Sequence, residues 1–170
     1  MIAGVMKGKR AIVLMLAAGL FASCGGLEPG AESYLPENAP AATSRDNELA
    51  AEIEQQLNSL RKSEGKSRVR VNEKVSTVAR IHSRDMAAGL APLGIDGQAA
   101  RRSAAGLLSS GEMVAAVGNR GEGTAKRIVD FLASDEDNRF MLVERGPKCG
   151  IGVAHSSDGR AFVTLIMGTR

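Results

Sequence analysis

The chain has 170 residues, a length typical of one domain, and its five aromatic residues include no tryptophan. Its formal net charge is +3, with 22 basic and 19 acidic residues. Three of the basic residues, Lys7, Lys9 and Arg10, lie in a predicted leader, so the mature chain carries 19 residues of each sign. This balance does not support a long-range electrostatic field for nucleic acid or anionic lipid, and no nucleic-acid partner is expected.

Residues 1–23 have the order of a signal peptide. The basic segment MKGKR (6–10) precedes twelve apolar residues (11–22), a run too short to span a membrane comfortably. The sequence LFASC (20–24) resembles a bacterial lipobox, in which the cysteine is lipidated and becomes the first mature residue. We predict a lipoprotein signal peptide; an ordinary secreted protein is the alternative.

Residues 24–45 are predicted to form the lipidated N-terminus and a flexible linker. They hold three of the five prolines and show no periodicity. Membrane attachment is therefore expected through the lipid on Cys24. Because Gly25 is not aspartate, outer-membrane sorting is expected in a Gram-negative cell. The folded domain is predicted at 46–170.

Helices are predicted at 46–65, 72–89 and 98–105, where apolar residues recur every three or four positions. Asn72 is the expected N-cap of the second helix. The inward face of that helix is expected to carry Val75, Val78, Ala79, His82 and Met86. Residues 110–123 are expected to form a loop with a brief apolar run.

Further helices are expected after Thr124 and from Ser134. The C-terminal segments 149–155 and 161–167 are predicted strands, because they flank the hairpin signal Asp158-Gly159. Both strands are apolar on both faces and should lie between layers. This order of elements predicts an α+β fold with a small central antiparallel sheet.

Five motifs occur in an order that resembles bacterial members of the CAP superfamily, the SCP-like or PR-1-like secreted domains. They are LNSLRKSEG (57–65), VSTVARIHSRDMA (75–87), GE (111–112), IVDFLASDED (128–137) and CGIGVA…FVTLIMG (149–168). The resemblance covers about residues 47–169. It implies an α-β-α sandwich with a cavity that better-known members line with histidines and glutamates, sometimes holding zinc.

The resemblance also indicates which cavity residues differ here. Ile95 stands where the family pattern GHDG has histidine, and Asp96 keeps the aspartate. Glu112 matches the glutamate of GEN, but Met113 replaces its asparagine. Asp137 stands at the histidine of SPGHR. A histidine-based metal site is therefore not expected, and no cofactor is predicted.

An apolar cavity lining is predicted from Ile95, Met113 and Leu165, the last at the usual glutamine position. Glu112, if buried beside them, should have a raised pKa. The leading interpretation is a lipid-anchored, non-catalytic envelope protein that binds a small apolar ligand or an envelope partner.

Two other interpretations stay open. One is a divalent-cation-dependent hydrolase that uses Glu112 with Asp96 or Asp137, since oxygen ligands suit Ca²⁺ or Mg²⁺. The acidic run 135–137 has a simpler explanation as the first turn of a helix. The other is a structural protein that acts through its surface, with Ile95 filling the volume of the missing imidazole.

Four further expectations concern residues outside that pattern. His82 is predicted to be a packed core residue, and His155 an exposed residue at the hairpin. Cys149 is predicted to be a buried, unreactive thiol. The basic residues of segment 62–74 alternate with glutamates, which indicates a solvated face.

Overall fold

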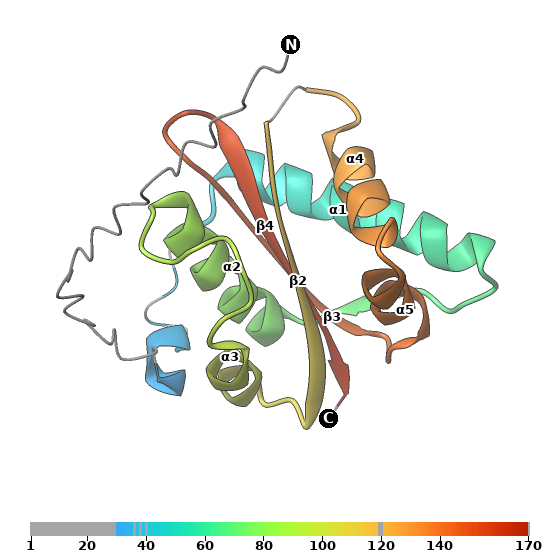
Figure 1. Cartoon of the computed structure of the whole chain (residues 1–170), viewed down its shortest axis with the longest axis horizontal. Coiled ribbons are helices and arrows are strands. Elements are labelled where there is room, and N and C mark those ends of the chain that lie inside the picture. The colour runs from blue at the N-terminus through green and yellow to red at the C-terminus, as the bar shows by residue number, and fades with distance from the viewer. Residues whose placement is uncertain (1–29, 36, 38, 40, 119–120, 170) are drawn as a thin grey trace, which may run out of the picture.

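The computed structural model describes residues 30–169 apart from 36, 38, 40, 119 and 120. The predicted leader and Cys24 lie outside the described residues. In the described part a four-stranded sheet lies between two layers of helices, as Figure 1 shows. The expected α+β sandwich is confirmed.

The strand order in the sheet is β1-β3-β4-β2. The central hairpin joins β3 (Lys148–His155) to β4 (Arg160–Thr169), and their predicted burial on both faces is confirmed. The short β1 (Arg70–Val71) pairs in parallel with β3, so the sheet is not purely antiparallel.

The prediction of a loop over 110–123 is wrong for most of its length, because β2 spans Ser109–Gly118. It pairs with β4 along its whole length, from Ser109 opposite Thr169 to Gly118 opposite Arg160. Its sequence, SSGEMVAAVG, contains glycines and alanines that have little strand preference of their own. Pairing with β4 therefore determines this strand more than local propensity does.

One face of the sheet carries α1 (Ser44–Ser63), α4 (Thr124–Ala133) and α5 (Glu136–Glu144). The larger core lies here and includes Leu49, Ile53 and Leu57 of α1, Ile128 and Leu132 of α4, and Met113, Ile151, Val163, Leu165 and Met167 of the sheet. Each such aliphatic side chain stabilises the fold by about 1.5–3 kcal/mol through burial.

The other face carries α2 (Glu73–Ala87), α3 (Gln98–Ala105) and the 3-10 helix η1 (Ala31–Tyr34). A smaller core here comprises Tyr34, Val75, Val78, Ala79, Ile81, Ala105, Leu107 and Ile166. The expected inward residues of α2 are all buried. Because the smaller core has fewer apolar residues, this face has room for the polar side chains described below.

Capping explains where three of the helices begin. Thr43 and Asp46 form a reciprocal capping box at α1. The predicted Asn72 cap is confirmed, since its side chain accepts from the Val75 N–H at 3.2 Å. Asp135, rather than Ser134, caps α5 and leaves Asp137 in the exposed acidic first turn.

Part of the predicted flexible linker packs against the domain. Tyr34 of η1 is only 3% exposed and contacts α2 and α3. The described part of 24–45 is thus not a free tether throughout. None of the helices in the described part of the chain is long and apolar enough to cross a bilayer.

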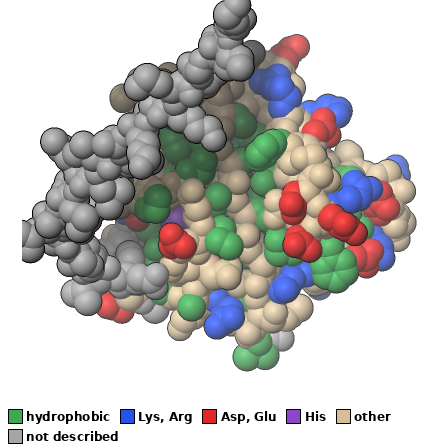
Figure 2. Space-filling model, in the orientation of Figure 1, with side chains coloured by type: hydrophobic (Ala, Val, Ile, Leu, Met, Phe, Trp, Pro, Cys, Tyr) green, Lys and Arg blue, Asp and Glu red, His purple; other side chains and the backbone are tan. Residues whose placement is uncertain are grey.

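Figure 2 shows Lys and Arg side chains interspersed with Asp and Glu on the visible face. Several of these charges form exposed ion pairs, such as Lys126 with Asp130 and Lys66 with Glu144, both at 2.6 Å. This arrangement agrees with the predicted charge balance of the mature chain. Exposed pairs of this kind contribute at most about 1 kcal/mol each.

Candidate functional site

A buried ion pair lies between the sheet and α3. Glu112 points from β2 towards the α2–α3 face, and the Nε of Arg101 donates to its two carboxylate oxygens at 2.7 and 3.0 Å. Arg101 is 1% exposed and Glu112 is 5% exposed. Two opposite charges at this depth require each other, because either one alone would be strongly destabilising.

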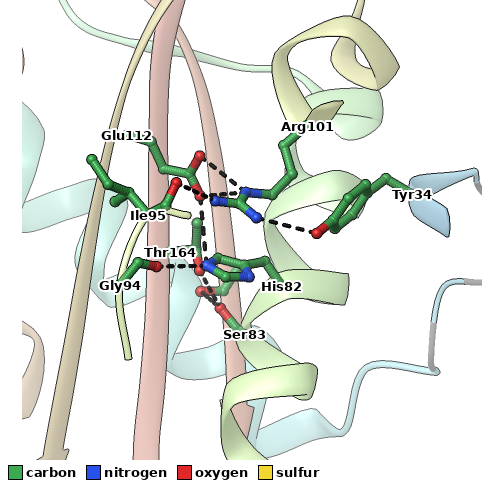
Figure 3. A network of polar contacts seen from close by, with 9 residues as sticks. Tyr34, His82, Ser83, Gly94, Ile95, Arg101, Glu112 and Thr164 are labelled. Carbon is green, nitrogen blue, oxygen red and sulfur yellow. Dashed lines mark hydrogen bonds and ion pairs between the residues drawn. The ribbon is translucent and has the colours of Figure 1, made fainter. Parts of the chain in front are cut away.

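The rest of the Arg101 guanidinium also has partners, as Figure 3 shows. Nη1 donates to the Tyr34 hydroxyl at 3.1 Å, and Nη2 donates to the Ile95 carbonyl at 3.0 Å. The guanidinium carbon lies 5.6 Å from the centre of the Tyr34 ring, within cation–π range. Arg101 therefore joins η1, the α2–α3 connection and β2.

Arg101 and Tyr34 were not among the residues singled out from the sequence. Arg101 lies four positions before Ala105, and these two are the buried residues of α3. Their spacing places both on one face of the predicted 98–105 helix. That pattern is the signal that could have indicated an inward-facing arginine. No comparable signal exists for Tyr34, whose partner is 67 positions away.

His82 of α2 lies beside the ion pair and is 2% exposed. Its Nε2 lies 2.9 Å from the Gly94 carbonyl, which can only accept, so Nε2 carries a proton. Burial, together with the nearby Arg101 charge, lowers the pKa of His82 below its ordinary value. The distance from Nε2 to Glu112 Oε1 is 3.8 Å, too long for a hydrogen bond. The prediction of a packed core histidine is confirmed.

Burial raises the pKa of Glu112, although the charge and hydrogen bonds of Arg101 oppose that shift. The expected raised pKa is thus found, but the predicted apolar neighbours are not its cause. A carboxylate held by a fixed guanidinium has its charge balanced within the protein. Arg101 thereby occupies one acceptor site on each oxygen of this carboxylate.

The predicted apolar lining is wrong. Met113 and Leu165 face the α1–α4 side and belong to the larger core, on the opposite face of the sheet from Glu112. Successive side chains of a strand point to opposite faces, so Glu112 and Met113 cannot share a cavity wall. Ile95 is 42% exposed and does not fill the place of an imidazole.

The three carboxylates proposed to bind a cation do not converge. Asp96 is exposed in the α2–α3 connection, and Asp137 is exposed on α5, across the sheet from Glu112. The described residues contain no group of three His, Cys, Asp or Glu side chains that could hold a metal ion. A cation site made of all three carboxylates is therefore not formed in this part of the chain.

His155 differs from its prediction, because its side chain is largely buried. Its Nδ1 lies 2.6 Å from Asp46 Oδ1, which links the hairpin to the start of α1. Burial raises the pKa of Asp46, but hydrogen bonds from Thr43 and His155 outweigh that effect and lower it overall. This contact therefore helps to hold the N-terminus of α1 against β3.

Cys149 fulfils its prediction as a buried thiol. It is fully buried in the larger core, and burial raises its pKa to about 12. Very little thiolate forms at neutral pH, so the residue is a poor nucleophile. Ser83, on α2, lies 3.0 Å from the Gly152 carbonyl and 2.9 Å from the Thr164 hydroxyl. These contacts join α2 to the sheet and show no nucleophile–base pair.

The model of the Cysteine-rich secretory protein (CAP) family matches residues 54–167, about two thirds of the chain. The chain belongs to the CAP family. No curated protein is similar enough in sequence to match it. The ordered motifs that resembled this family in the sequence are thereby confirmed as a CAP domain.

Three solved structures resemble the CAP domain described above. An extracellular protein with an SCP domain from Bacillus anthracis has 18% identity and a TM-score of 0.57, over 78% of this chain and 45% of its own. An outer surface protein from Borrelia burgdorferi has 17% identity and a TM-score of 0.57, over 76% of this chain and 96% of its own. A cysteine-rich secretory protein from Staphylococcus aureus has 12% identity and a TM-score of 0.60, over 76% of this chain and 41% of its own.

The chain therefore spans less than half the length of the Bacillus and Staphylococcus proteins and nearly all of the Borrelia protein. At these identities the similarity establishes the fold of the CAP domain. The chemistry of its polar cluster must be inferred from Arg101, Glu112 and His82 themselves.

The CAP domain should lose stability as the pH falls through the ordinary histidine pKa of 6.5, because the pKa of His82 is lower in the folded state. In this pH range His82 is protonated in the unfolded chain but stays neutral in the folded chain, which favours unfolding. We expect the free energy of unfolding, measured with urea, to fall by up to about 1.4 kcal/mol per pH unit on acidification.

His82→Gln is the control for this pH dependence. Its amide can still donate to the Gly94 carbonyl, but it does not titrate. The raised pKa of Glu112 acts with the opposite sign, since stability then falls as pH rises, and it is present in both proteins. Equal slopes for the wild type and His82→Gln below pH 6.5 would contradict the role assigned to His82.

Proposed function

We propose that this protein is exported, is anchored to the cell envelope by a lipid on Cys24, and uses its CAP domain for binding rather than catalysis. Its partner would be another component of the envelope, contacted through the outer surface of the domain. The observation that carries the proposal is the buried Arg101–Glu112 pair, with its Nε–Oε1 distance of 2.7 Å.

The chemistry of the polar cluster supports a non-catalytic role. Glu112 matches the glutamate of the family's cavity pattern, and an internal arginine balances its charge. The nearby His82 has a lowered pKa and donates from Nε2 to a backbone carbonyl. Both groups are thus engaged in holding the fold, and a structural role explains their contacts fully.

The position of Tyr34 supports binding through the outer surface. Its buried ring and its hydroxyl cover one side of Arg101, and the Ile95 carbonyl covers another. A ligand would have to displace these contacts to reach Glu112. Binding through exposed residues requires no such cost.

Export and anchoring are supported by the N-terminal sequence. The basic segment, apolar run and LFASC motif have the order that a lipoprotein signal requires. Two structural relatives are an extracellular protein and an outer surface protein, which agrees with export. A neutral mature chain is also compatible with an exposed position at the envelope.

One experiment tests both parts of the proposal. The full chain, Cys24→Ala and Glu112→Gln would be expressed in bacteria, fractionated, and cross-linked in intact cells. We expect Cys24→Ala to leave the membrane fraction or to remain an uncut precursor. Glu112→Gln should stay in the membrane and give the wild-type cross-links, because glutamine keeps an acceptor for Arg101.

Two results would overturn the proposal. Unchanged membrane retention of Cys24→Ala would remove the lipid anchor. Loss of the cross-links in Glu112→Gln, with its circular dichroism spectrum still native, would assign Glu112 to a functional site. A lower Tm of Glu112→Gln without loss of cross-links would fit the structural role given to the pair.

A further inference from the structure

The α2–α3 connection exposes several large apolar side chains close together. Leu90 is 77% exposed, Leu93 is 56% exposed and Ile95 is 42% exposed, all within six residues. They make up three of the eight exposed large hydrophobic residues in the described part of the chain. Single exposed apolar residues are ordinary on a protein surface, whereas such a group indicates a contact surface. Figure 2 shows hydrophobic side chains over α2 and this connection.

The backbone of this connection is fixed to the domain. The Gly94 carbonyl accepts from His82 at 2.9 Å, and the Ile95 carbonyl accepts from Arg101 at 3.0 Å. Both donors are buried, so these carbonyls face inward while the side chains of Leu93 and Ile95 stay in contact with solvent. The connection thus presents its apolar side chains from a defined backbone, which suits a lasting contact.

Docking of Tyr34 shortens the path from the predicted anchor to the domain. Six residue steps separate Cys24 from Gly30, which precedes η1, and they reach at most about 20 Å. A linker free as far as Asp46 would have reached about 75 Å. The side of the domain that carries η1 must therefore lie near the membrane if Cys24 is lipidated.

The exposed apolar residues lie next to that side. Tyr34 and Ile95 bind the same guanidinium of Arg101, so η1 and the α2–α3 connection are neighbours. Leu35, directly after Tyr34, is also 39% exposed. The anchor and the apolar side chains thus meet on one part of the surface.

We propose that residues 90–95 contact the bilayer that holds the lipid anchor, with Leu90 and Leu93 entering the boundary between headgroups and acyl chains. This inference rests on the anchor in the proposed function. The lipid holds only the N-terminus, and burial of further apolar surface at the interface would strengthen the attachment of the domain. The contact would also fix which face of the CAP domain points away from the membrane.

The absence of tryptophan from the chain permits a direct test. The full chain with Leu93→Trp would be produced with its lipid and reconstituted into vesicles of phosphatidylethanolamine and phosphatidylglycerol, with and without brominated acyl chains. We expect a blue-shifted emission and quenching by about twofold or more in the brominated vesicles. Phe131→Trp is the matched control, since Phe131 is 62% exposed on α4, across the sheet.

Each result has a definite meaning. Quenching of the tryptophan at 93 but not at 131 supports the membrane contact. Vesicle-bound protein with neither tryptophan quenched, or with both quenched equally, overturns it while leaving the anchor intact. Protein that fails to float with the vesicles overturns the anchor and the contact together. Circular dichroism checks the fold of both variants, and substitution at two exposed positions should leave it unchanged.

Discussion

Arg101→Met is expected to lower the free energy of unfolding by about 3–5 kcal/mol. Methionine keeps much of the aliphatic volume but removes the charge that balances Glu112, whose carboxylate would stay 5% exposed without an ionic partner. The bonds to Tyr34 and the Ile95 carbonyl are lost as well. Urea unfolding at neutral pH, followed by circular dichroism, measures the loss.

Arg102→Met is the matched control, because Arg102 is the adjacent arginine of α3 and is exposed. Its effect should stay within about 0.5 kcal/mol. The double variant Arg101→Met with Glu112→Gln should recover part of the stability, since it removes both buried charges. Equal losses in the two arginine variants, or no recovery in the double variant, would show that the ion pair is not the cause.

The stability of Arg101→Met should also depend on pH in a defined direction. Without Arg101, only burial acts strongly on Glu112, so its pKa should rise further above the ordinary 4.5. The folded state then binds a proton that the unfolded state releases, and stability falls as the pH rises through this range. The Arg101→Met variant should therefore gain stability relative to wild type on acidification towards the ordinary carboxyl pKa.

This arrangement gives the polar cluster a structural interpretation. Arg101 provides a permanent positive charge at the carboxylate, and its planar group satisfies three acceptors from different parts of the chain. A solvated cation would need several ligands to do the same. Burying the two charges is unfavourable in itself, but the contacts of Arg101 link α3 to η1, to the α2–α3 connection and to β2.

The sequence was sufficient to predict the elements that are determined by their own residues and immediate neighbours. The α2 helix follows from its Asn72 cap and its inward apolar face, and the hairpin follows from Asp158-Gly159. The strand β2 could not be predicted in the same way. Its alanines and glycines have no strong preference, and its partner β4 lies about fifty residues away in the chain.

The candidate site was predicted only in part. Glu112, its burial and its raised pKa followed from the family pattern. Its partner Arg101 was missed because pairing between side chains depends on tertiary packing. The error at Met113 had a different origin, since the two-residue alternation of a strand would have separated it from Glu112 once β2 was recognised.

Gly152→Ala is expected to lower the free energy of unfolding by about 3 kcal/mol or more, near the upper end for overpacked sites. A Cβ at this position would overlap the backbone of Ala79 and Arg80 in α2. Backbone atoms cannot move aside as a flexible side chain can, so α2 would have to shift from the sheet. Chemical denaturation measures the change, and Gly118→Ala is the control, since a Cβ there meets nothing within 4 Å.

The shift should also be felt at the polar cluster. Ser83 and His82 lie on the same helix, and Ser83 contacts the Gly152 carbonyl at 3.0 Å. Moving α2 outward would lengthen this contact and admit water around His82, which weakens the burial that lowers its pKa. We therefore expect the pKa of His82, followed by NMR, to move back towards 6.5 in Gly152→Ala and to stay unchanged in Gly118→Ala. A stable Gly152→Ala variant with an unaltered His82 titration would show that the close packing of α2 on β3 does not control the environment of this histidine.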